Sequence, residues 1–176
     1  MSKMNNLKPL FSENEIRVRV QEIADEINRD YQSKDVLVVG VLKGACIFFS
    51  DLIRLIDLPI QVDFIIASSY VKNKSSGEVQ IHNKVNETIK DKDVLIVEDI
   101  VDTGLTTSYL IKMISEKKPK SLKVCALLDK KEGRKVEVPI DYIGFEISNQ
   151  FVVGYGMDHE NKFRNIPYIA VLENTT

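Results

Sequence analysis

The sequence has no tryptophan and, among its 176 residues, only two cysteines and two histidines. Two cysteines cannot build a disulfide framework or the paired CxxC motifs of a zinc site. Cys46 and Cys125 both lie within apolar stretches, which predicts reduced thiols in the core. No apolar run approaches the roughly 18 residues of a membrane span, and residues 1–14 lack the apolar segment of a signal peptide. We therefore expect a soluble, cytoplasmic protein without a membrane partner.

An excess of charge of either sign is also missing. The chain has 24 Lys and Arg residues against 26 Asp and Glu residues, a formal net charge of −2. This balance argues against a protein that a net basic surface holds on nucleic acid, although it leaves room for a small basic pocket. The length suits a single domain, and 44% hydrophobic residues is too high a share for a disordered chain.

Apolar runs and amphipathic segments alternate along the chain. A capping box at Ser12 begins a helix that extends to about Tyr31. Runs typical of strands buried on both faces occur at 36–41, 94–97 and 122–128, with helices expected at 45–55 and from 102 to just before Pro119. Further strands are expected at 60–69, 78–81, 142–145 and 168–172. The alternation predicts an α/β fold with a doubly wound, mostly parallel sheet.

The strongest functional signal follows the run at 94–97. Glu98 and Asp99 are adjacent carboxylates that repel each other at the end of a buried strand. Binding of a cation or a vicinal diol therefore explains this pair better than a purely structural role does. Asp102 then begins a turn whose amides and hydroxyls, with Gly104 allowing close approach, could hold a phosphate at a helix N-terminus. Taken singly, these features are compatible with an ordinary helix cap and a solvated loop. Together they favour a phosphate site.

Two other phosphate chemistries do not fit. A nucleoside triphosphatase of the P-loop type needs the motif GxxxxGK[ST], which does not occur. A receiver domain would have its acid pair after the first buried strand, yet that strand is followed by the sequence Gly40-Val41-Leu42-Lys43. The sequence therefore excludes both a P-loop nucleoside triphosphatase and a receiver domain.

Residues 94–107 resemble the phosphoribosyl pyrophosphate (PRPP) signature of type I phosphoribosyltransferases. Over nearly its whole length the chain is similar to the hypoxanthine-guanine phosphoribosyltransferases. The elements that carry this similarity are 42–44, Ser69 and Tyr70, Lys130, 151–155, Asp158 and 163–164. A resemblance of this kind implies the type I phosphoribosyltransferase fold, with a small hood formed by the chain termini.

The resemblance implies a role for each residue at the PRPP end of the site. Glu98 and Asp99 would hold the ribose 2′- and 3′-hydroxyls with Mg²⁺ nearby, and Asp102 would act as general base or acid at purine N7. Lys43 would follow a cis peptide bond and line the pyrophosphate site. The full set expected to bind PRPP is Lys43, Gly44, Glu98, Asp99, Asp102, Thr103, Gly104, Leu105, Thr106 and Arg164. Leu105 stands where some relatives have a lysine.

At the purine end, the resemblance implies that Lys130 donates a hydrogen bond to the exocyclic O6 of the base. An ammonium group only donates hydrogen bonds, so it favours a 6-oxo group over the 6-amino group of adenine. Phe151 would stack on the base with Ile100 on the opposite face, Val152 would offer its backbone, and Asp158 would lie near the exocyclic edge. Judged without the resemblance, Lys130 would be interpreted as part of a solvated run of charges and Phe151 as a core residue. Arg164 would be interpreted as an exposed charge near the C-terminus.

The implied activity is displacement of pyrophosphate from C1 of PRPP by N9 of hypoxanthine or guanine, giving IMP or GMP in purine salvage. Two alternatives stay open: a non-catalytic, nucleotide-binding RNA regulator on the same fold, and a xanthine-preferring or orotate-using transferase. We expect one domain over 1–176, with a core at about 30–130 and a hood formed by the N-terminal segment and about 131–176. A lid is expected at about 70–80, with Ser69 and Tyr70 as its site residues. The family also suggests a homodimer or homotetramer.

Overall fold

The computed structural model describes residues 7–69, 79–81, 85 and 87–173. Most of the segment expected to form a lid, including Tyr70, lies outside these residues. The described strands and helices follow in the order β1 (Leu7–Phe11), α1 (Glu13–Asp30), β2 (Val36–Leu42), α2 (Cys46–Ile53), β3 (Ile60–Ser69), β4 (Val79–Ile81), β5 (Asp93–Val101), α3 (Leu105–Ser115), β6 (Ser121–Asp129), a 3₁₀ turn (Lys131–Gly133), β7 (Tyr142–Glu146), β8 (Val152–Val153) and β9 (Ile169–Leu172).

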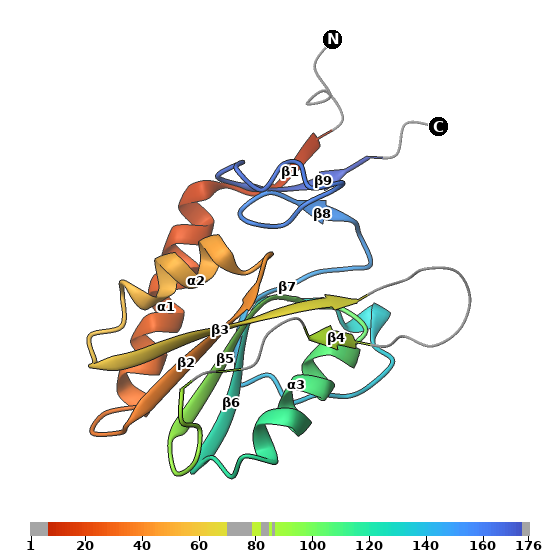
Figure 1. Cartoon of the computed structure of the whole chain (residues 1–176). Coiled ribbons are helices and arrows are strands. Elements are labelled where there is room, and N and C mark those ends of the chain that lie inside the picture. Colours follow the sequence, from red (N-terminus) through yellow and green to blue (C-terminus); the bar gives the residue numbers. More distant parts are fainter. Residues whose placement is uncertain (1–6, 70–78, 82–84, 86, 174–176) are drawn as a thin grey trace.

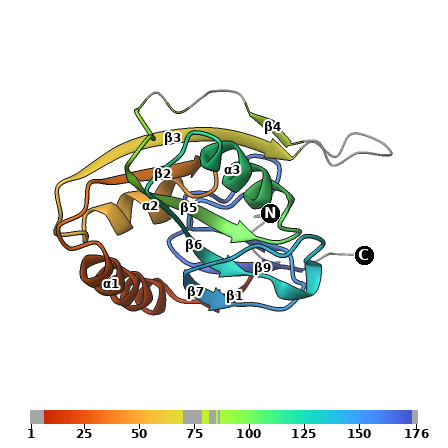
Figure 2. The same ribbon diagram turned by 90° about the horizontal axis from the view of Figure 1, so that it is seen from below.

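A six-stranded sheet with the order β4-β3-β2-β5-β6-β7 forms the centre of the molecule (Figure 1). Its strand pairs are all parallel except β3 with β4. The helices α1 and α2 cover one face and α3 covers the other (Figure 2). This arrangement confirms the predicted doubly wound, mostly parallel α/β fold.

Alternation along β2 explains why both faces of the sheet are buried. Val36 and Val38 pack in the cluster that includes α1 and α2, whereas Leu37 and Val39 pack in the cluster that includes α3. Successive side chains of a strand point to opposite faces, so a continuous run of Val and Leu serves both layers. No helix in the described part of the chain is both long and apolar enough to cross a membrane.

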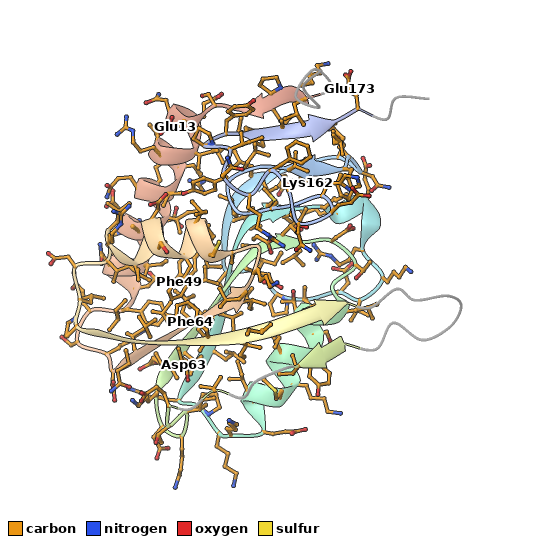
Figure 3. The ribbon with its side chains drawn as sticks, turned by 45° about the horizontal axis from the view of Figure 1, so that its top comes forward. Glu13, Phe49, Asp63, Phe64, Lys162 and Glu173 are labelled. Atoms are coloured by element: carbon orange, nitrogen blue, oxygen red, sulfur yellow. The ribbon has the colours of Figure 1, made fainter. Side chains whose placement is uncertain are left out.

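Aromatic packing fixes α2 against the sheet. Phe49 of α2 lies 4.9 Å from Phe64 of β3, measured between ring centroids (Figure 3). A Cβ on Gly40 of β2 would come within 2.7 Å of the Phe49 ring, so only glycine leaves room for it. The start of α2 is thereby held close to the carboxyl end of β2.

A second, three-stranded sheet with the order β1-β9-β8 brings the two ends of the described chain together (Figure 1). Strand β9 was predicted from the sequence, whereas β1 and β8 were not. The short β1 contains Pro9 and forms its ladder with residues about 160 positions away, so no local pattern predicts it. The structure also places β7 in the main sheet, which therefore extends beyond residue 130.

The position of the site follows from the strand order. From β2 the sheet continues to β3 on one side, and from β5 it continues to β6 on the other, so the order reverses between β2 and β5. Ligands of such sheets bind outside the carboxyl ends of the strands at this point. Strand β5 extends to Val101, four residues beyond the predicted run, so Glu98 and Asp99 belong to the strand itself.

Candidate active site

A cavity of about 470 Å³ lies at the carboxyl ends of β2, β5 and β6. Fourteen of the residues predicted for the site line it: Lys43, Gly44, Glu98, Asp99, Ile100, Asp102, Thr103, Gly104, Thr106, Lys130, Phe151, Val152, Asp158 and Arg164. Leu105 is the first residue of α3 but does not line the cavity. Ser69 ends β3, and Tyr70 lies outside the described residues.

The two adjacent acids differ in their surroundings. Glu98 is 5% exposed, and its Oε2 atom has no hydrogen-bond partner within the described part of the chain. Burial, and secondarily the charge of Asp99, raises the pKa of Glu98 well above its usual range. Burial raises the pKa of Asp99 to about 6, against the backbone hydrogen bonds and the Arg164 charge that lower it. Such a pair has acceptor capacity that the fold does not use.

The loop after β2 approaches the acids closely. A Cβ on Gly44 would lie 1.7 Å from Oδ2 of Asp99, so any larger residue would displace the carboxylate. The peptide bond between Leu42 and Lys43 is cis, in agreement with the resemblance. Lys43, Gly44 and Asp99 all line the cavity.

The turn before α3 has the geometry of an anion cradle. Gly104 is the N-cap of α3 with a φ of 79°, a left-handed conformation that favours glycine, and a Cβ there would meet the carbonyl oxygen of Val136 at 2.2 Å. The first amides of a helix have no intrahelical acceptor and so can bind a phosphate. Thr106 and Thr107 lie in the first turn of α3 and line the cavity.

Lys130 and Asp102 form an ion pair, with Nζ of Lys130 3.0 Å from Oδ2 of Asp102. The Lys130 side chain is 9% exposed and the Asp102 side chain 42% exposed. A Cβ on Gly133 would lie 2.0 Å from the other carboxylate oxygen of Asp102, so that glycine makes room for the acid. A carboxylate partly open to the cavity beside a desolvated ammonium can exchange a proton with a bound molecule.

The remaining wall comes from the C-terminal loops. Phe151 is 52% exposed, and the edge-to-face contact of its ring with His159 has a centroid distance of 5.3 Å. Arg164 contacts Asp158 at 2.5 Å and donates to the carbonyl oxygen of Gly156 at 2.7 Å. An exposed aromatic face opening into a cavity offers a stacking surface to a planar ligand.

Sequence reasoning missed several residues of this region. Gln150 and Met157 line the cavity. Arg134 lies just behind it, in an ion pair with Asp129 in which the two side chains are 7% and 2% exposed. The local sequence Lys-Lys-Glu-Gly-Arg-Lys gives no sign of this burial, because charge runs of this kind are usually solvated. The only available signal was the position of the segment directly after a buried strand.

The described residues contain no group of three or more His, Cys, Asp or Glu side chains arranged to hold a metal ion. Glu98 and Asp99 nevertheless supply carboxylate oxygens, the ligand type that Mg²⁺ prefers, together with the unpartnered Oε2 of Glu98. Because Mg²⁺ binds through one or two carboxylates plus substrate oxygens, the two acids fit this ion.

Comparison with known proteins decides the family. The phosphoribosyl transferase domain profile matches residues 9–160. The hypoxanthine-guanine phosphoribosyltransferase of Bacillus subtilis is 45% identical over 174 residues, which cover 98% of this chain and 97% of that protein. The chain belongs to the hypoxanthine-guanine phosphoribosyltransferase family. Membership confirms the resemblance inferred from residues 94–107 and the elements around them.

Two further relatives place the chain within this phosphoribosyltransferase family. The hypoxanthine phosphoribosyltransferase of Trypanosoma cruzi, solved in complex with the product IMP, has a TM-score of 0.89 and 40% identity, and 96% of each chain is covered. The bifunctional protein TilS/HprT of Listeria monocytogenes is 46% identical over 167 residues, 94% of this chain. The chain spans about a quarter (26%) of the length of that relative.

Proposed function

We propose that the chain transfers the phosphoribosyl group of PRPP to N9 of hypoxanthine or guanine, giving IMP or GMP and pyrophosphate. The observation that carries this proposal is one cavity that combines an acid pair, an anion cradle, an Asp–Lys pair and an exposed aromatic ring. Each matches one part of the two substrates. The IMP bound by the Trypanosoma cruzi relative supports this product class.

The PRPP subsite consists of residues from β2, β5 and α3. Glu98 and Asp99 accept hydrogen bonds from the ribose hydroxyls, and the buried Oε2 of Glu98 has no other partner within the described residues. The turn at Thr103–Thr107 binds the 5′-phosphate through amides and hydroxyls. Lys43 and Arg164 supply positive charge for pyrophosphate, with the Gly44 backbone beside them.

The purine subsite lies on the other side of Asp102. Lys130 donates to O6 of the base, and Phe151 and Ile100 enclose its two faces. Val152 offers backbone groups to the base edge and Asp158 lies near the exocyclic position. The Lys130 ammonium has only hydrogen-bond donors, so it would face the donors of a 6-amino group and disfavours adenine, which supports a 6-oxopurine substrate.

In the reaction, the bond from C1 to the pyrophosphate oxygen breaks and the bond from C1 to N9 forms with inversion. Positive charge develops on the sugar and negative charge on the leaving group, where Lys43 and Arg164 stabilise it. As N9 bonds to C1, the Asp102 carboxylate accepts the proton that leaves N7, and Lys130 stabilises negative charge that develops on O6. Residues 70–80, for which a lid was expected, would exclude water on closing.

Magnesium is part of the proposal. Bound beside Glu98 and Asp99, Mg²⁺ would neutralise charge on the pyrophosphate group and orient it. We also propose a cytoplasmic location, supported by the free cysteines Cys46 and Cys125, and a homodimer or homotetramer without a nucleic-acid partner. Asp102, which RNA-binding regulators of this fold can lack, lines the cavity here and favours the enzyme.

Purified protein with PRPP, Mg²⁺ and a panel of bases tests the function. We expect ultraviolet absorbance and chromatography to show nucleotide formation with hypoxanthine or guanine and little with adenine or orotate. Turnover with xanthine alone would favour the xanthine-preferring alternative. Absence of turnover with every 6-oxopurine would overturn the proposal.

A further inference from the structure

Arg134 is a charged residue near the cavity for which the proposed function assigns no role. Its guanidinium contacts three acceptors. Nε donates to the carbonyl oxygen of Asp102 at 3.0 Å, and Nη2 donates to the carbonyl oxygen of Val101 at 3.3 Å and pairs with Oδ1 of Asp129. Arg134 does not line the cavity, so it would act on the substrates only through other residues.

These acceptors, two backbone carbonyl oxygens and the Asp129 carboxylate, belong to the two segments that carry the Asp102–Lys130 pair. Val101 and Asp129 are partners in the parallel ladder between β5 and β6. The backbone N–H of Lys130 donates to the same Val101 carbonyl oxygen at 3.0 Å. One guanidinium therefore contacts the last residue of β5, the residue before Lys130 and Asp102 itself.

The segment around Arg134 also contacts the cradle turn. The carbonyl oxygen of Thr103 accepts hydrogen bonds from the N–H groups of Lys135 and Val136, at 2.9 and 3.1 Å. A Cβ on Gly104 would lie 3.0 Å from Cδ of Arg134. Arg134 thus lies between the proton-moving pair and the phosphate-binding turn.

Arginine suits this position for a physical reason. Its planar fork can serve three acceptors in fixed directions, whereas the lysine ammonium is a point charge on a flexible stem. A buried ion pair has a large desolvation cost and is a poor source of stability, so the Arg134–Asp129 pair has no evident advantage as a purely structural feature.

We propose that Arg134 is a positioning residue: its guanidinium fixes the position of the Asp102–Lys130 pair relative to the phosphate-binding turn. This inference rests on the proposed function, because the relative position of the Asp102–Lys130 pair and the phosphate-binding turn affects the rate only if one ligand contacts both. Displacement of reacting groups by about an ångström can reduce a rate about a hundredfold.

The test compares Arg134→Lys with a matched control, Arg19→Lys. Arg19 also donates to two backbone carbonyl oxygens, those of Ile143 and Gly144, and pairs with a carboxylate, but it lies on α1 and does not line the cavity. We expect Arg134→Lys to lower kcat by about 10- to 100-fold with KM for PRPP and purine within about threefold. Arg19→Lys should lower Tm and leave kcat unchanged.

A second variant, the double substitution Arg134→Gln with Asp129→Asn, replaces the ion pair by two neutral amides and should show the same loss of kcat. Wild-type kcat in folded Arg134→Lys, an effect on KM alone, or failure of both variants to fold would overturn the positioning role. Failure of the proposed function is distinguishable from these outcomes, because the wild-type protein itself would then show no turnover.

Discussion

Nζ of Lys130 lies 3.0 Å from Oδ2 of Asp102, and both residues line one cavity. The ammonium is enclosed while the carboxylate is partly open, so the pair has one desolvated and one accessible member. In the proposed reaction, the two residues face O6 and N7 of the same purine ring. The contact therefore links recognition of the base to movement of its proton.

Asp102→Asn tests the proton-moving role. The amide keeps the size of the side chain but cannot act as a base, so we expect kcat to fall by about 10²- to 10⁴-fold. Affinity for IMP, measured by calorimetry, should change far less. Equal losses in kcat and in IMP affinity would make Asp102 a binding residue instead.

Lys130→Gln tests how the base is selected. A glutamine amide can accept as well as donate a hydrogen bond, so it no longer disfavours a 6-amino group. We expect the ratio of kcat/KM for hypoxanthine to that for adenine to fall at least tenfold. Lys131→Gln is the control, because Lys131 forms an exposed ion pair with Glu146 and does not line the cavity. An unchanged ratio in Lys130→Gln would contradict the assignment.

Glu98→Gln should separate stability from function. Replacing a buried carboxylate that has an unpartnered oxygen by a neutral amide removes a desolvation cost. At pH 8 without ligand we expect Tm to rise by about 2–4 °C, while KM for PRPP increases because an acceptor for the ribose is lost. Glu160→Gln, at an exposed glutamate, should change neither. A fall in Tm would show that Glu98 stabilises the fold.

Asp30 gives a pH-dependent prediction away from the site. Hydrogen bonds from Lys123 at 2.7 Å and Tyr142 at 2.6 Å hold the pKa of Asp30 below its usual range. A lowered folded-state pKa stabilises the protein above the unfolded-state value, about 3.9, and this contribution is lost as pH falls through the folded value.

We therefore expect Asp30→Asn to lower the free energy of unfolding at pH 6 by at most about 1 kcal/mol, because the carboxylate is largely exposed. The difference from wild type should shrink below pH 4, as measured by urea unfolding from pH 2.5 to 6. Asp25→Asn, whose partner is the neutral Gln21, is the control. A difference that stays constant with pH would rule out the charge as its source.

The sequence predicted the parts of the molecule that depend on local patterns. Val- and Leu-rich runs predicted β2, β5 and β6. The capping box at Ser12 predicted the start of α1, and the structure contains this box in full. The acid pair and the turn at Gly104 were visible because their residue types are unusual after a buried strand. In the structure both line the same cavity.

Long-range features were not visible. Strand β1 exists through its ladder with β9, and the burial of Arg134 depends on Asp129 and on the carbonyl oxygens at the end of β5. Lys130 looks solvated in a run of charged residues, yet the fold encloses it. Burial of a charge is set by distant segments, so the sequence alone could not separate Lys130 and Arg134 from exposed Lys131.

The stoichiometry of pyrophosphate and nucleotide tests most directly whether the protein is a phosphoribosyltransferase. With PRPP, Mg²⁺ and hypoxanthine, we expect one pyrophosphate released for each IMP formed, and almost none when the purine is omitted. Pyrophosphate release at the same rate without a purine, or without matching nucleotide, would contradict a transferase.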